Sequence, residues 1–180
     1  MKWTNALVFA TTASAAAIHG QGVNFDILKQ VDTTLQEIIT MLNKENPAPT
    51  QSINGVFFHS RLTPLADAVR AEAHKIDQLG EAFSEEDGGR LYAPANKFPN
   101  LAVALDSALK GNGITAQLAE HGGCDIAGYI FSLQASLIDL SFLSHRILDR
   151  ISSYAGDAGF DNLRSFTRSL DKTGTMFKGC

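Results

Sequence analysis

Apolar residues recur at steps of three and four along most of this chain, which is the spacing of one face of an α-helix. The first such segment runs from Asn24 to Lys44 and stops at Asn46-Pro47. The second runs from Ser52 to Phe83. It contains Thr63-Pro64, a good N-cap and first-turn pair, so the pattern predicts a short helix, a kink and then a longer helix.

The later part of the chain continues the helical pattern. Its expected elements are a helix start resembling a capping box at Ser84–Asp87, a helix from Phe98 to Lys110, a short helical or irregular link over Ile114–Gly123, a long helix from Asp125 to Ser153, and a last helix from Phe160 to Met176. No segment alternates with period two, so we expect essentially no strand. The sequence predicts an all-α bundle of about five long helices, folded as a single domain over residues 18–180.

The segment from Asp125 to Ser153 is apolar on two sides. One stripe consists of Ile126, Tyr129, Ile130, Leu133, Leu137, Leu140, Ile147, Leu148 and Ile151. Phe131, Ile138 and Phe142 lie roughly on the opposite side. A helix that is apolar on two sides is expected at the centre of a fold. It is either an ordinary core helix or one whose second face lines a cavity for an apolar ligand.

The first seventeen residues, Met1 to Ala17, are typical of a secretory signal peptide. Lys2 precedes an apolar stretch, and Ala15-Ala16-Ala17 satisfies the rule of small residues at a cleavage site. We therefore expect cleavage near Ala17 and a soluble, secreted protein. No later segment approaches the roughly 18 uninterrupted apolar residues of a membrane span, so none is expected.

Two cysteines remain after the signal, Cys124 and Cys180. An even number of cysteines in a secreted chain favours a disulfide. The bridge would tie the C-terminal tail to the start of the long helix. Two free thiols and an intermolecular bridge are the alternatives.

Composition narrows the functional classes. The chain is 44% hydrophobic and 19% charged with a net charge of −4, which indicates a compact, mildly acidic protein. The chain has no excess of basic residues, so binding to nucleic acid is not expected. There is no Gly-x-Ser-x-Gly elbow, His-Glu-x-x-His motif, phosphate loop or dinucleotide fingerprint. We expect a protein that is not an enzyme, with no cofactor and no metal.

The layout of the chain resembles the fungal hydrophobic surface-binding protein A family, also called cell wall galactomannoproteins. The resemblance rests on a secretion signal followed by the helical segments Val23–Leu42 and Leu65–Leu79, the Phe83-Ser84-Glu85-Glu86-Asp87 helix start, the Pro-then-Leu-x-x-x-Leu helix from Phe98 to Lys110, and the long helix Ile126–Ile151. It covers nearly all of the chain after the signal.

The resemblance implies an all-α secreted bundle of the fungal wall or medium. Members of the family are linked to binding hydrophobic surfaces, recruiting hydrolases to them and holding fatty acids inside the bundle. This chain departs from wall-attached members because it has two cysteines, is richer in Phe and lacks a Ser/Thr-rich tract at its C-terminal end. A freely secreted form, acting on a host, therefore fits better than a wall-attached one.

We interpret the sequence as that of a secreted lipid-binding protein that holds a fatty acid or similar apolar molecule within its helices. The candidate ligand contacts are Phe131, Gln134, Ser136, Ile138 and Phe142, with Gln134 or Ser136 taking the carboxylate. The alternative is a secreted surface-binding or effector protein without an internal ligand. It would contact hydrophobic surfaces, or a host or secreted protein, through an exposed apolar patch.

Overall fold

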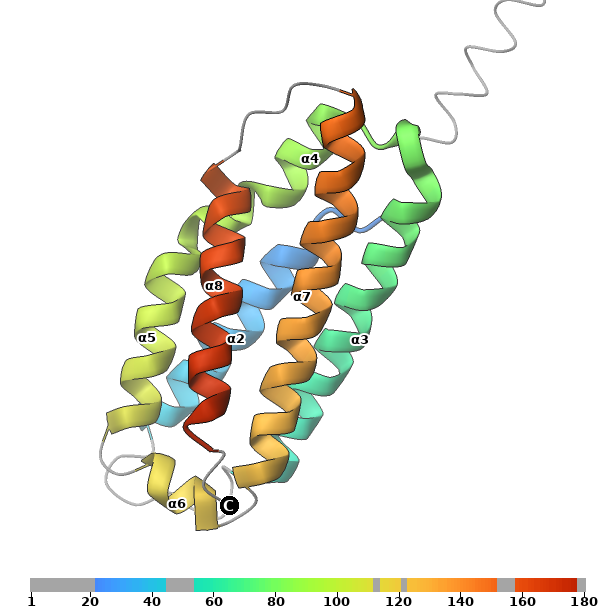
Figure 1. Ribbon diagram of the computed structural model, residues 1–180. Coiled ribbons are helices and arrows are strands. Elements are labelled where there is room, and N and C mark those ends of the chain that lie inside the picture. Colours follow the sequence, from blue (N-terminus) through green and yellow to red (C-terminus); the bar gives the residue numbers. More distant parts are fainter. Residues whose placement is uncertain (1–21, 45–53, 112–113, 121–122, 152–157, 178–180) are drawn as a thin grey trace, which may run out of the picture.

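The computed structural model describes residues 22–44, 54–111, 114–120, 123–151 and 158–177 (Figure 1). Within these ranges every regular element is a helix, which confirms the predicted all-α fold. The elements are α2 (Ile27–Lys44), α3 (Gly55–Leu79), the 3-10 turn η1 (Gly80–Ala82), α4 (Glu85–Tyr92), the 3-10 turn η2 (Ala93–Lys97), α5 (Phe98–Lys110), α6 (Ile114–Glu120), α7 (Gly123–Ile151) and α8 (Ala158–Thr175). The predicted signal peptide lies outside the described residues.

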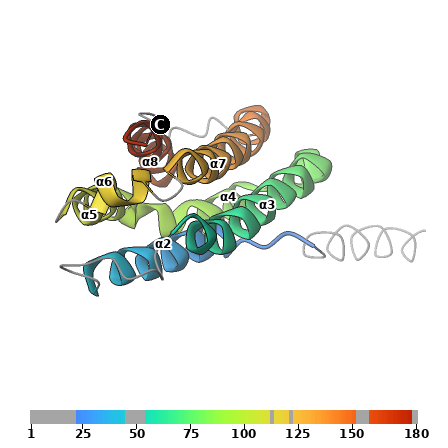
Figure 2. The same ribbon diagram turned by 90° about the horizontal axis from the view of Figure 1, so that it is seen from below.

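The five long helices form a closed ring in which each contacts two neighbours. Going round the ring, α2 contacts α3, α3 contacts α7, α7 contacts α8, α8 contacts α5, and α5 returns to α2. Seen along the bundle, α2 and α3 make one layer, while α7 and α8 make the other (Figure 2). Each long helix therefore has an inner face toward the core and an outer face.

The periodicity of the sequence accounts for the inner faces. The buried residues of α2 follow the three-and-four spacing and are Ile27, Leu28, Val31, Leu35, Ile38 and Leu42. On α8 the same spacing buries Phe166, whose ring centroid lies 4.8 Å from that of Phe98 on α5. This aromatic pair joins α5 to α8 within a single core.

Helix starts follow local capping chemistry. The Ser84 hydroxyl accepts a hydrogen bond from the Asp87 backbone N–H at 3.2 Å, and the Asp87 carboxylate accepts one from the Ser84 N–H at 3.1 Å. This is the capping box that the sequence predicts, with Asp in the place of the usual Glu or Gln. Asn54 caps α3, because its side-chain oxygen accepts from the backbone N–H groups of Val56 and Phe57.

The predicted division of the second segment into two helices at Thr63-Pro64 is wrong. One continuous helix, α3, runs through both residues, and Pro64 lies inside it. Pro64 is exposed, whereas its neighbours Leu62 and Leu65 are buried. Burial of the apolar residues on either side of the proline thus stabilises a continuous helix, while the proline ring itself lies toward solvent.

A short segment before α2 is tied to α3 and to the start of α4. The Asn24 N–H donates to a carboxylate oxygen of Glu72 at 2.8 Å, and Glu72, which is buried, also pairs with Lys75 at 2.8 Å. The Phe25 ring packs against Phe83 with the centroids 6.4 Å apart. These contacts fix the point at which the chain enters the bundle.

Replacing Glu72 by alanine should release this entry segment. Because a hydrogen bond to a charged group contributes about 1.5–3 kcal/mol, the unfolding free energy should fall by that order. Glu72→Gln, which keeps an acceptor oxygen for the Asn24 N–H, should lose less. Urea unfolding measures the loss, and hydrogen exchange at the Asn24 amide should accelerate in Glu72→Ala. An unchanged exchange rate would contradict the role of Glu72.

Candidate functional site

Helix α7 occupies one wall of the ring, between α3 and α8, and its outer face is exposed (Figures 1 and 2). Ile138 and Phe142, one turn apart on that face, are 45% and 63% exposed. Ala135, a turn earlier, is also exposed. We call these three residues the α7 patch. The other large exposed apolar side chains of the described residues, Val56 and Val103, lie on α3 and α5.

The second apolar face of α7 is expected from the sequence to be covered, either as ordinary core or as the lining of a cavity, and at Ile138 and Phe142 this expectation is wrong. With five long helices closed into a ring, α7 packs its main stripe inward and turns Ile138 and Phe142 to solvent. No described helix covers that side. The periodicity indicates two apolar faces, but only one of them is buried.

The five candidate ligand contacts differ in burial, and Ile138 and Phe142 face solvent. Phe131 is half-buried, and two of its ring carbons lie 2.7 Å from where a Cβ on Gly174 of α8 would be, so the ring packs between α7 and α8. Ser136 is fully buried and donates to the Ser132 carbonyl at 3.0 Å. Gln134 is half-buried. Ligand binding by these residues stays a prediction, and none of them lines the two surface hollows or the central space described below.

The centre of the ring is closely packed. The enclosed space there measures about 10 Å³ and is lined entirely by apolar residues from all five long helices, namely Leu35, Ile38, Phe58, Leu62, Leu105, Leu109, Ile130, Leu133 and Leu170. Pockets for small molecules typically measure roughly 300–1,000 Å³. This space is therefore about the size of one water and does not admit an acyl chain.

Three serines of α7 donate hydrogen bonds to carbonyls of their own helix. Ser136 donates to Ser132, Ser141 donates to the Ile138 carbonyl at 2.9 Å, and Ser144 donates to the Leu140 carbonyl at 2.6 Å. These bonds to carbonyls three or four residues back leave the serines little need for water. Ser136, Ser141 and Ser144 are also buried, so they add no polar surface to the α7 patch.

Charged groups border the α7 patch. Arg146 makes an ion pair with Asp77 of α3, which places it on the α3 side of the patch. On the α8 side, His145 stacks on the Phe160 ring with centroids 4.1 Å apart, and its Nε2 lies 3.3 Å from Asp149. Asp139 is exposed, and no ion pair of its carboxylate occurs within the described ranges. The patch thus has an apolar centre and a polar border.

By length and composition, α7 is also the one helix of the described residues that could cross a membrane. Nearly half of the qualifying segment is buried inside the bundle. Core helices of soluble proteins commonly have this composition, so this finding adds no argument for a span.

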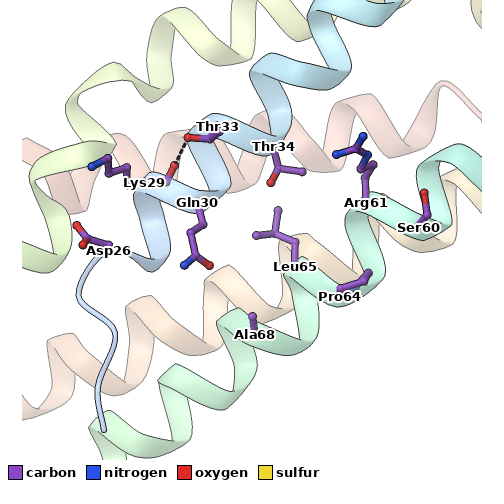
Figure 3. Close-up of a pocket in the computed structure, with 10 residues that line it drawn as sticks. All are labelled: Asp26, Lys29, Gln30, Thr33, Thr34, Ser60, Arg61, Pro64, Leu65 and Ala68. Atoms are coloured by element: carbon purple, nitrogen blue, oxygen red, sulfur yellow. Dashed lines mark hydrogen bonds between the residues drawn. The ribbon is translucent and has the colours of Figure 1, made fainter. Parts of the chain in front are cut away.

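A second surface feature is an open groove between α2 and α3 (Figure 3). It holds about 590 Å³ and is lined by Asp26, Lys29, Gln30, Thr33, Thr34, Ser60, Arg61, Pro64, Leu65 and Ala68. Gln30 and Thr34 face Leu65 across the groove in Figure 3. Sequence reasoning missed it, because its two walls come from separate helices and no motif marks either of them.

The groove has a mixed lining, in which polar side chains are joined by the apolar Pro64, Leu65 and Ala68. A neighbouring hollow of about 660 Å³ shares Thr33 and Arg61 with it and adds Glu37, which accepts a hydrogen bond from Arg61 at 2.7 Å. Hydroxyl, amide and oppositely charged groups occur in the lining of both hollows. Such a lining suits a molecule with both polar and apolar groups.

The sequence also supports predictions about a disulfide and about metal binding. Cys124, in the first turn of α7, is exposed and disulfide-bonded. Cys180, the other cysteine of the sequence, lies outside the described residues. Within the described part of the chain, no group of three or more His, Cys, Asp or Glu side chains is arranged to hold a metal ion.

Comparison with known proteins adds no relative from which a role could be transferred. No protein-family model matches the chain, and neither a curated protein nor a solved structure matches it. The candidate site therefore has to be interpreted from its own geometry.

Proposed function

We propose that this chain is a secreted, non-catalytic binding protein that attaches to apolar surfaces through the α7 patch. The observation that carries the proposal is the exposure of Ile138 and Phe142, 45% and 63%, side by side on one helix face. The resemblance of the sequence to the hydrophobic surface-binding protein A family supports the same assignment. Secretion rests on the signal peptide pattern of residues 1–17.

The size of the patch suits reversible adsorption. Covering the exposed parts of one Phe and one Ile removes about 200 Å² of apolar surface from water, worth roughly 5 kcal/mol at about 25 cal/mol per Å². Immobilising the protein offsets a large part of this gain. Single molecules should therefore exchange between surface and solution.

Adsorption of the purified protein to octadecyl-coated silica beads tests the proposal. Phe142→Asp and Ile138→Asp should each weaken adsorption at least tenfold, because a charge in the contact must be desolvated. Val103→Asp is the matched control, since Val103 is 67% exposed but lies on α5. Circular dichroism checks that each variant folds. Equal adsorption by all three variants and the unmodified protein would refute the proposal.

Retention of a fatty acid inside the bundle is a separate mode of binding, because it requires the closely packed core to open. Mass spectrometry of an organic extract of the purified protein decides between the two modes. Surface adsorption predicts an extract without stoichiometric fatty acid. One fatty acid per chain would establish an internal ligand and would overturn the surface-binding mode as the main function.

A further inference from the structure

The border of the α7 patch has a self-complementary arrangement of charge. Asp139 and Arg146 are seven residues apart, which at about 100° per residue brings them to nearly the same edge of the helix. That edge faces α3, because Arg146 pairs there with Asp77. Phe142 lies between them along the helix, so an acid, an aromatic ring and a base follow one another.

Asp139 identifies the kind of occupant that the patch fits. Its carboxylate is exposed, and in the part of the chain that the structure describes it takes part in no ion pair. A hydrocarbon surface offers no cation, so adsorption to it has to leave the Asp139 carboxylate in water at the border of the patch. A second copy of this chain offers Arg146.

We propose that two copies associate through their α7 patches as an antiparallel, two-fold symmetric pair. With the two-fold axis passing near Phe142, Asp139 of each copy lies opposite Arg146 of the other, and the two Phe142 rings meet at the centre. The axis lies in the interface, so the α3 edge of one copy faces the α3 edge of its partner. The contact is isologous and closes at two copies.

The side chains can accommodate this pairing. Arg146 binds Asp77 through one terminal nitrogen, and a guanidinium has five N–H donors, so it can also serve Asp139 of the partner. Ala135, two turns from Phe142 along α7, is exposed and small, so it leaves room for the partner helix at that end of the patch. The pair buries the same α7 patch that the proposed function uses for adsorption. The pairing itself does not depend on that function; only the competition between pairing and adsorption rests on it.

Sedimentation equilibrium of the purified protein, over a range of concentrations and without any surface present, tests the pair. The unmodified protein should show a monomer–dimer equilibrium. Asp139→Lys and Arg146→Asp should each raise the dimer dissociation constant at least tenfold, because like charges then face each other twice. Mixing the two variants in equal amounts should restore association. In the mixed pair the introduced lysine of one copy meets the introduced aspartate of the other, and the two unmodified residues, Arg146 and Asp139, also face each other.

A control separates this effect from damage to the fold. Asp77→Asn removes the internal partner of Arg146 but leaves the contact between copies, so it should dimerise like the unmodified protein. A protein that is monomeric at all concentrations would overturn the proposal, as would a mixture that fails to associate. If the protein adsorbs to beads but does not pair, the pairing proposal fails and the proposed function stands. If it pairs but does not adsorb, the proposed function fails and the pairing proposal stands.

Discussion

Replacing Phe166 by alanine should lower the unfolding free energy by about 3–5 kcal/mol, the usual cost of truncating a packed phenylalanine. Phe166 is 1% exposed, and its ring packs on Phe98 where α8 meets α5. The same substitution at Phe142, which is 63% exposed, should change stability by about 0.5 kcal/mol or less. The two variants differ only in position, so each controls for the other.

Urea unfolding followed by circular dichroism measures both variants. The expected result is a large shift of the midpoint for Phe166→Ala with an unchanged slope, and almost no shift for Phe142→Ala. A comparable loss at the two positions would show that the outer face of α7 is covered in the folded protein. That result would contradict the position of α7 in the wall of the ring.

Replacing Gly159 by alanine should destabilise the protein by about 1–3 kcal/mol through overpacking. A Cβ at this position would lie 2.5 Å from the backbone carbonyl oxygen of Tyr92, so α8 and the end of α4 would have to move apart. Tyr92 is fully buried, and its hydroxyl is hydrogen-bonded to Ser144 of α7. Moving its backbone therefore disturbs three helices together.

Gly128→Ala is the matched control for Gly159→Ala. Gly128 lies within α7, is exposed, and has open space where its Cβ would be. Alanine there should stabilise the protein by roughly 0.5–1 kcal/mol, because glycine is costly within a helix. In thermal unfolding, the midpoint temperature should fall for Gly159→Ala and rise for Gly128→Ala. A stabilised Gly159→Ala protein would contradict the close approach at Gly159.

Helix positions were largely predictable because their signals are local. The Ser84–Asp87 box, the Phe98 start and the Lys110 end of α5 are set by residues within a turn or two of each boundary. Pro64 shows the limit of this reasoning. Its local signal is a helix start, yet the apolar face that includes Leu62 and Leu65 carries α3 through it.

The candidate site was predictable only in part. Ile138 and Phe142 were identified as a second apolar face of the long helix, and they lie together on α7. Their exposure was not predictable, since a stripe of apolar residues has the same spacing whether it meets a core, a cavity or water. The groove between α2 and α3 left no signal, because Gln30 and Leu65 come together only when the helices pack.

Most helix ends and the two apolar faces of α7 follow from local sequence signals, because hydrogen bonds and side-chain periodicity within a helix act over a few residues. Which of the two faces is buried depends on how the helices pack against one another. Five long helices close a ring around one core, and the ring can take in only one face of each. The α7 patch is exposed because Ile138 and Phe142 lie on the face that the ring leaves outside.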